Sequence, residues 1–99
     1  MFVTNHAMVL LCIAENPDLR VRDIAAMVGI TQRATQAILT DLDEGGFVTR
    51  VRRGRRNHYS VNRDANLRHP LVQSVTIGEL LDILRSQRSV GLAGARLAF

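Results

Sequence analysis

The chain has 99 residues, which suits one domain with a modest core, and 46% of them are apolar, which excludes a disordered basic tail. The net charge is +4, and all thirteen basic residues are arginine. The one cysteine excludes an intrachain disulfide and fits a reducing cytoplasm. No apolar run reaches the roughly 20 residues of a membrane span, and the first residues lack the pattern of a signal peptide, so we expect a cytoplasmic protein with no membrane partner.

Residues 4–16 are predicted to form the first helix, with Thr4 or Asn5 as its cap. The middle of this segment is apolar on every side, which indicates a helix that is buried all round. One face should pack on the helices that follow, and the other needs a separate cover. Cys12 lies in this run and is interpreted as an inert buried side chain, because no cation lies at helical spacing from it to favour a reactive thiolate.

The next stretch predicts a helix, a tight turn and a second helix. Gly29 should end the first of these helices, because glycine adopts the left-handed conformation without a Cβ penalty. Thr31 should cap the second helix by accepting a hydrogen bond from a backbone N–H. The start of the first helix is less well marked: no Ser, Thr, Asp or Asn occupies the cap near Arg20, although Asp23 suits the dipole of the first turn. The apolar stripe of this helix consists of Ile24, Ala25, Met27 and Val28.

The second helix, predicted over residues 32–44, has two different faces on a wheel of about 100° per residue. Its inward face should carry Thr35, Ile38, Leu39 and Leu42. Its outward face carries side chains that are uncharged or positive: Gln32, Arg33, Gln36, Ala37 and Thr40. Arginine reads guanine and glutamine reads adenine, and the acids come late, away from the N-terminal end that enters a groove. The alternative is an ordinary amphipathic helix with a solvated polar face.

Gly45 and Gly46 should stop this helix, and a β-hairpin is predicted to follow. Strand-forming residues flank an arginine-rich tip over residues 52–57, with Gly54 at the bend. Residues 45–63 hold six arginines and no acid, so with a total of +4 the rest of the chain sums to −2, and the positive charge is local. Such a hairpin beside a polar helix is an electrostatic footprint for phosphates. A solvated loop, a localisation signal or an RNA-binding arm would also explain the charge.

A connector is expected over residues 63–75, followed by a helix over 76–88 and a tail over 89–99. Thr76 and Glu79 form the Thr-x-x-Glu pattern of a capping box. Four apolar residues then follow the i, i+3, i+4, i+7 spacing of an amphipathic helix: Ile77, Leu80, Leu81 and Leu84. The apolar stripe of this helix therefore needs a surface to cover it.

No pattern in the sequence indicates a metal site, a cofactor site or a catalytic set. His6, His58 and His69 are scattered, and no cysteine or acid joins them at ligand spacing. The sequence shows neither a nucleophile paired with a base nor a glycine-rich phosphate loop. We therefore expect no metal, no cofactor and no enzymatic activity.

Four segments follow one family pattern: 23–25 (DIA), 28–31 (VGIT), 42–48 (LDEGGFV) and 54–59 (GRRNHY). Through them residues 5–61 resemble the winged-helix domain of MarR-like bacterial transcriptional regulators, and secondarily of ArsR-like ones. The resemblance implies that Gln32, Arg33 and Gln36 lie where the recognition helix meets the major groove. It also implies that Arg53, Arg55 and Arg56 lie on the wing. The Asp-x-Arg wing signature of full-length MarR proteins is absent, and this chain is shorter than those proteins.

Together these features predict a mainly α fold with a small β-hairpin: a winged helix-turn-helix over residues 1–62 and a C-terminal helix. The expected function is sequence-specific binding of duplex DNA in transcriptional regulation. The alternatives are a winged helix that serves as a protein-interaction module in a larger assembly, or RNA binding through the basic hairpin. The candidate DNA contacts are Thr31, Gln32, Arg33, Gln36, Thr40, Arg50, Arg52, Arg53, Arg55, Arg56 and Asn57.

A homodimer is expected, because a two-fold dimer doubles the contacts of one domain over half-sites one helical turn apart. The resemblance implies the same, since MarR-like and ArsR-like proteins dimerise through terminal helices. The helices over 4–16 and 76–88 both have apolar surface to cover, although the connector also allows packing within one chain. The candidate dimer contacts are Met8, Leu11, Ile77, Leu80, Leu81 and Leu84.

Overall fold

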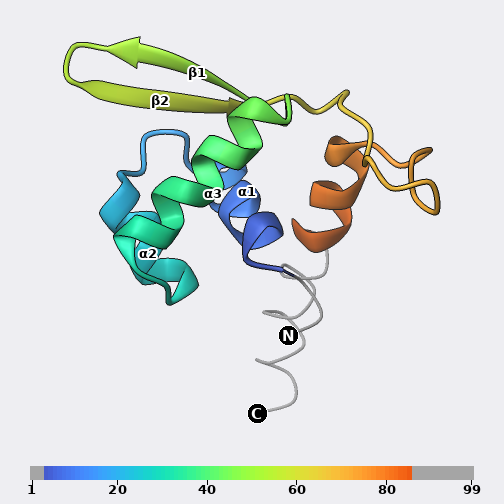
Figure 1. The fold of residues 1–99 in the computed structure, drawn as a ribbon, viewed down its shortest axis with the longest axis horizontal. Coiled ribbons are helices and arrows are strands. Elements are labelled where there is room, and N and C mark those ends of the chain that lie inside the picture. Colours follow the sequence, from blue (N-terminus) through green and yellow to red (C-terminus); the bar gives the residue numbers. More distant parts are fainter. Residues whose placement is uncertain (1–3, 86–99) are drawn as a thin grey trace. The chain divides into compact units, whose positions relative to one another are not determined.

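The computed structural model describes residues 4–85, and the chain divides between Asn62 and Arg63 into two units. The first unit consists of three helices followed by a two-stranded antiparallel sheet (Figure 1). This mainly helical arrangement with a terminal hairpin is the winged helix-turn-helix that the sequence predicts. Its elements are α1 (Asn5–Glu15), α2 (Val21–Val28), α3 (Gln32–Glu44), β1 (Val48–Arg53) and β2 (Arg56–Val61).

Helices α1 and α3 begin where a threonine side chain satisfies one of the first backbone N–H groups. Thr4 accepts a hydrogen bond from Ala7 N–H at 3.5 Å, and Thr31 accepts one from Ala34 N–H at 3.0 Å. These two caps are the predicted ones. The start of α2 is held differently, because the Asp23 carboxylate reaches back to Arg20 N–H at 3.1 Å.

The turn between α2 and α3 depends on a glycine with left-handed backbone geometry. Gly29 has a φ of 85°, and its N–H donates to the carbonyl of Ala25 at 2.8 Å. Ile30 N–H donates to the same carbonyl at 3.0 Å. Three residues, 29–31, thus separate the end of α2 from the start of α3, as the sequence predicts for a helix-turn-helix.

The end of α3 requires two adjacent glycines for different reasons. Gly46 has a φ of 78°, and Phe47 N–H returns to the carbonyl of Leu42 at 2.9 Å, which closes the last turn of the helix. A Cβ atom on Gly45 would lie 2.8 Å from the Phe47 ring. The helix therefore stops at Glu44, and the chain reverses into β1.

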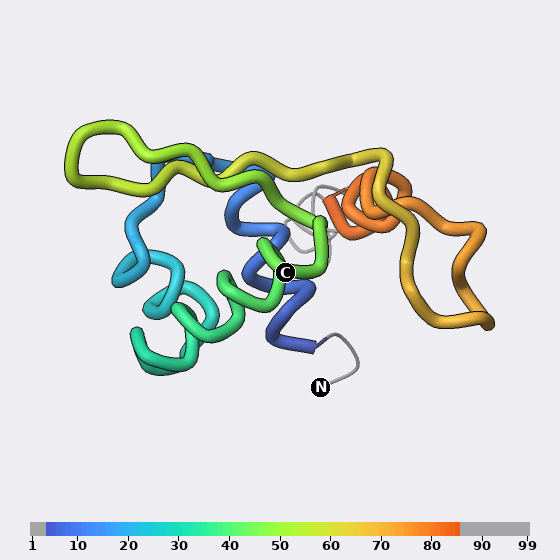
Figure 2. Tube along the Cα trace, turned by 45° about the horizontal axis from the view of Figure 1, so that its top comes forward, coloured from blue at the N-terminus to red at the C-terminus, as the bar shows by residue number. Residues whose placement is uncertain are grey.

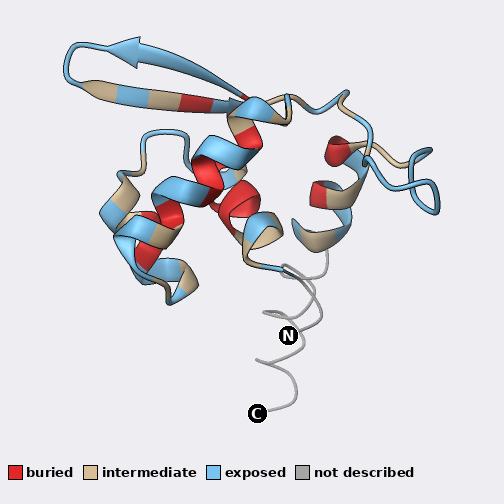
Figure 3. Cartoon of the chain, viewed as in Figure 1, coloured by how far each residue is buried: buried red, intermediate tan, exposed pale blue. Residues whose placement is uncertain are grey.

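Buried side chains come from every element of the first unit, as Figure 3 shows. The middle of α1 is buried without interruption from Val9 to Ile13, which confirms the prediction of a helix buried on all sides. Thr35 is fully buried, and its hydroxyl donates to the carbonyl of Thr31 at 2.9 Å, so this core position carries no unsatisfied polar group. The other buried residues of the first unit are Ile24, Ala25, Ile38, Leu39, Leu42, Val48 and Tyr59.

The hairpin has a tighter turn than the six-residue tip that the sequence predicts. The ladder runs from the pair Val48–Val61 to the pair Arg53–Arg56, which leaves only Gly54 and Arg55 in the turn. Gly54 has a φ of 61° and Arg55 a negative φ, which is the pattern of a type II′ turn with glycine first. The remaining residues of the expected tip therefore belong to the strands.

The second unit begins with a segment that folds back on itself instead of running as a plain connector. Leu67 N–H donates to the carbonyl of Val75 at 2.9 Å, and Ile77 N–H donates to that of Ala65 at 2.8 Å. Residues 77–85 are helical. The predicted end of this helix and the tail over 89–99 lie outside the described residues.

The helix over 77–85 starts with the predicted capping box. Glu79 N–H donates to the Thr76 hydroxyl at 3.2 Å, and Thr76 N–H donates to the Glu79 carboxylate at 3.1 Å. Arg63 also braces this start, since its guanidinium lies 2.8 Å from the Asp82 carboxylate. None of the helices described over residues 4–85 is long and apolar enough to cross a membrane.

Candidate nucleic-acid interface

The two faces of α3 differ in composition as the helical wheel predicts. Thr35, Ile38, Leu39 and Leu42 are buried. The opposite face is exposed and carries Gln32, Arg33, Gln36, Ala37 and Thr40. The capping oxygen of Thr31 accepts from the backbone, and the Thr40 hydroxyl donates to the carbonyl of Gln36 at 3.0 Å. The long side chains of Arg33 and the two glutamines are therefore the groups of this face that can extend to a partner.

We call residues 48–61, which form β1, β2 and their turn, the wing. Residues directly opposite each other in an antiparallel pair share a face, and the faces alternate along each strand. One face of the wing carries buried Val48 and Tyr59, and also Arg50, Arg52 and Asn57. The other face carries Arg53, Arg56 and His58. The arginines that the sequence groups together are thus divided between two faces.

The first of these faces is turned toward α3. Arg50 Nε lies 3.8 Å from the Asp43 carboxylate at the end of that helix. Arg52 Nε donates to the carbonyl of Gly54 at 3.2 Å, which holds this arginine along the turn. Arg50, Arg52, Arg53 and Arg55 are all exposed. The wing therefore presents a positively charged surface next to the outward face of α3.

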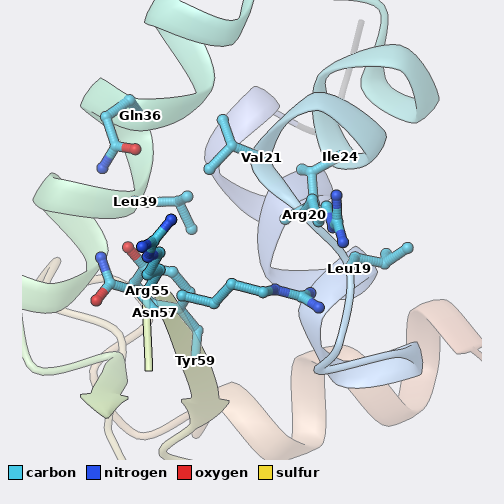
Figure 4. A pocket seen from close by; sticks show the side chains of 10 residues that line it. Leu19, Arg20, Val21, Ile24, Gln36, Leu39, Arg55, Asn57 and Tyr59 are labelled. Carbon is cyan, nitrogen blue, oxygen red and sulfur yellow. The ribbon is translucent and has the colours of Figure 1, made fainter. Parts of the chain in front are cut away.

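A hollow of about 390 Å³ joins the two surfaces (Figure 4). Gln36 of α3 and Arg55 and Asn57 of the wing lie around it, while Leu39 and Tyr59 contribute apolar surface. The remaining lining comes from α2, the loop before it and the wing: Leu19, Arg20, Val21, Ile24 and Arg56. One base-reading candidate of α3, Gln36, and the tip of the wing thus border the same concave surface.

Arg56 differs from the other wing arginines, because it is half-buried and bonded to the body of the unit. Its guanidinium donates to the backbone carbonyl of Asp18, in the loop between α1 and α2. Two residues further along, His58 Nδ1 lies 3.3 Å from the Asp18 carboxylate. Figures 1 and 2 both show this loop beside β2. The sequence gives no sign of this cluster, because no local pattern links residues that lie 38 and 40 positions apart in the chain.

A second histidine joins two other elements of the same unit. His6 Nε2 lies 3.0 Å from the Asp41 carboxylate, so it links the first turn of α1 to α3. Both side chains are largely exposed, and such a pair contributes little to stability in water. Across residues 4–85, no group of three or more histidines, cysteines and acids is placed to hold a metal ion.

The candidate dimer residues fall into two groups by exposure. Leu11, Ile77 and Leu81 are buried in the single chain, whereas Met8, Leu80 and Leu84 are half-buried. Ile83, which is not among the predicted contacts, is 59% exposed. At about 100° per residue, Leu80, Ile83 and Leu84 occupy one side of the helix next to the buried stripe.

The helix-turn-helix, the polar outward face of α3 and the basic wing define a winged-helix DNA-binding domain. The family model described as MarR family matches residues 4–56, just over half of the chain, and the protein belongs to that family. It is therefore, in general terms, a DNA-binding transcriptional regulator, and members of the family are regulators and not enzymes. Comparisons with curated proteins and with solved structures gave no match.

Proposed function

We propose that the protein regulates transcription by binding a specific duplex sequence, with α3 in the major groove and the wing on phosphates or in the minor groove. The observation that supports this proposal best is the common concave surface that Gln36 of α3 shares with Arg55 and Asn57 of the wing. A major groove about 12 Å wide admits one helix. With α3 in the groove, an adjoining wing would meet the flanking backbone.

The reading of bases is assigned to the N-terminal half of α3. Gln32, Arg33 and Gln36 are exposed and lie within the first two turns of the helix. Residues three or four apart share a helical face, so these side chains can reach neighbouring base pairs together. Arginine hydrogen-bonds both acceptors of guanine, and glutamine matches the donor and acceptor of adenine.

Arg33→Ala and Gln36→Ala should each weaken binding to the preferred sequence by about 1–3 kcal/mol and relax the preference at one position of each half-site. The preferred sequence is first obtained by selection from a random DNA pool, and binding is then measured in gel shifts with every single-base variant. Arg22→Ala, which removes an exposed arginine from α2, is the matched control. Equal weakening on all sequences by both α3 variants would refute direct readout by this helix.

The wing is proposed to supply the contacts that do not depend on sequence. Arg53→Gln and Arg55→Gln should each reduce the slope of log K against log salt by about 0.9, because each removes one cation that displaces counterions from DNA. The slope is measured by titrating labelled duplex at several salt concentrations, with Arg22→Gln as the charge-matched control. An unchanged slope in the double variant would make the wing a solvated loop, and tighter binding to RNA than to DNA would redirect the proposal to RNA.

The functional unit is proposed to be a symmetric dimer. Dimers are typical of the family, and two-fold dimers are the commonest assemblies of soluble proteins. A dimer would present two copies of α3 to half-sites about 34–36 Å apart, one turn of DNA. Among the described residues of the second unit, Leu80, Ile83 and Leu84 offer apolar surface for such an interface. Met8 of α1, in the first unit, is a further half-buried candidate.

A further inference from the structure

We propose that Asp18 is a positioning residue for DNA binding: through Arg56 and His58 it fixes the direction of the wing relative to α3. The inference rests on the proposed function, since it concerns how the wing reaches DNA. We call the contacts of Asp18 with Arg56 and His58 the tether. Arg53 and Arg55 remain the proposed phosphate contacts.

The need for such a tether follows from where the wing is anchored. Val48 and Tyr59 are buried, at 2% and 6% exposure, and both lie in the half of the hairpin nearer its base. All the residues of β1 that follow Val48 are exposed. A two-stranded hairpin is at best marginally stable by itself, so the half that carries the arginines has little apolar contact to hold it.

Polar contacts reach the wing on both of its faces. On the α3 side, in the half nearer the base, Arg50 approaches Asp43 at 3.8 Å. On the opposite side, Arg56 donates to the Asp18 carbonyl, and His58 Nδ1 approaches the Asp18 carboxylate at 3.3 Å. Arg56 and His58 share a face because they lie two positions apart on one strand. Asp18 therefore contacts the outer half of β2 at two successive positions of that face.

Asp18 can act as an anchor because its own loop is braced. Asn16 N–H donates to the carbonyl of Cys12 at 3.0 Å, which ties the loop to the last turn of α1. The Asn16 side chain accepts from Asp18 N–H at 3.0 Å, and the Asn16 carbonyl accepts from Leu19 N–H at 3.3 Å. Pro17 fixes one backbone torsion between them. The carboxylate thus stands on a short extension of the buried helix α1.

The direction in which Asp18→Asn changes the affinity for DNA separates a positioning role from a purely electrostatic one. Asp18 is exposed and lies beside a basic wing, so its negative charge by itself opposes the approach of DNA phosphates. Arg53 lines the same small surface hollow as Asp18 and His58, so its positive charge is one of those near the Asp18 carboxylate. If Asp18 were only a nearby charge, Asp18→Asn would tighten DNA binding. If it positions the wing, the same change would weaken binding, although it removes a negative charge.

The experiment compares Asp18→Asn with Glu44→Gln, which removes one exposed negative charge from the end of α3. We expect Asp18→Asn to weaken binding about three- to tenfold and to lower the salt slope, as the loss of one or two phosphate contacts would. Glu44→Gln should leave binding unchanged or slightly tighter. Thermal unfolding is measured in parallel and should be nearly the same for both variants, because the Asp18 side chain is 73% exposed and a contact with one partner in water adds little to stability. Tighter binding by Asp18→Asn would overturn the proposal.

A double-mutant cycle with His58→Asn tests whether Asp18 acts through the histidine. In the His58→Asn background, Asp18→Asn should have little further effect on binding, because interacting residues are not additive. If the effects of the two substitutions on the free energy of DNA binding were fully additive, Asp18 would not act through His58.

Hydrogen exchange of the wing amides in the DNA-free protein separates this inference from the proposed function. Faster exchange over residues 50–58 in Asp18→Asn, with no DNA binding by the wild type, would keep the tether and refute the function. Unchanged exchange in both Asp18→Asn and Arg56→Gln would refute the tether, whatever the result with DNA, because the first variant alters the carboxylate that faces His58 and the second removes the bond to the Asp18 carbonyl.

Discussion

Leu39→Ala is expected to lower the free energy of unfolding by about 2–5 kcal/mol, because it leaves a cavity in a closely packed core. Leu39 is fully buried in the middle of α3, on the face opposite the proposed base contacts. A domain of this size is stable by about 5–15 kcal/mol in total, so the loss is a large part of its stability. Each kcal/mol should lower the melting temperature by about 4–8 °C, measured by circular dichroism.

Met27→Ala on α2 serves as the control for this core substitution. Met27 is 60% exposed, so its truncation should change stability by no more than about 0.5 kcal/mol. Urea unfolding of both variants gives the free energies at a common temperature, and the comparison of their m-values checks that both unfold from equally compact states. Equal stability of the two variants would mean that α3 does not bury the face described above.

The sequence predicted α3 from its first residue to its last, because every local signal agreed. Thr31 supplies a cap, the apolar residues follow one helical stripe, and the pair Gly45–Gly46 ends the helix. Each of these signals lies within a few residues of the structure that it determines. The buried and exposed faces of α3 were therefore predictable, and so was the set of side chains available to a partner.

The beginning of α2 and the turn of the hairpin were harder to predict for physical reasons. Arg20 has no capping side chain, and the bond that replaces it comes from Asp23, three residues into the helix. In the hairpin, a run of arginines suggests a solvated tip, yet a strand ladder uses only backbone groups and tolerates arginine on exposed positions. The pairs Arg53–Arg56 and Arg52–Asn57 therefore extend the strands into the predicted tip.

The division of the wing arginines required the three-dimensional structure. Arg53, Arg55 and Arg56 look equivalent in a basic run, but Arg55 lies in the turn, and Arg56 is half-buried while Arg53, on the same face of the wing, is exposed. The carbonyl that accepts from Arg56 belongs to Asp18, far away in the chain, and the same residue engages His58. Charge patterns in the sequence locate a candidate phosphate-binding segment. Contacts between residues far apart in the sequence decide which arginines of that segment can reach a phosphate.

Leu84→Asp is expected to convert the proposed dimer into a monomer and to weaken binding to a palindromic two-site duplex by about 10²–10⁴-fold. An aspartate in an apolar interface loses its hydration without gaining a partner. A dimer gains from the second half-site because its second copy of α3 is already close to the DNA, and a monomer loses this gain. Binding to a single half-site should remain nearly unchanged, since Leu84 belongs to the second unit, whereas α3 and the wing belong to the first.

Ile83→Asp should act in the same direction, because Ile83 lies beside Leu84 on the helix and is largely exposed in the single chain. Leu71→Asp is the matched control: Leu71 is 86% exposed and precedes the helix, so the same chemical change should leave the dimer intact. Light scattering gives the mass of each variant, and gel shifts on one-site and two-site duplexes give the affinities. The dimer would be refuted by a wild-type protein that is monomeric at high micromolar concentration and binds the two-site duplex no more tightly than the Leu84→Asp variant does. The half-buried leucines of this helix would then serve only the single chain, and the specificity of the protein would come from one copy of α3 and its wing.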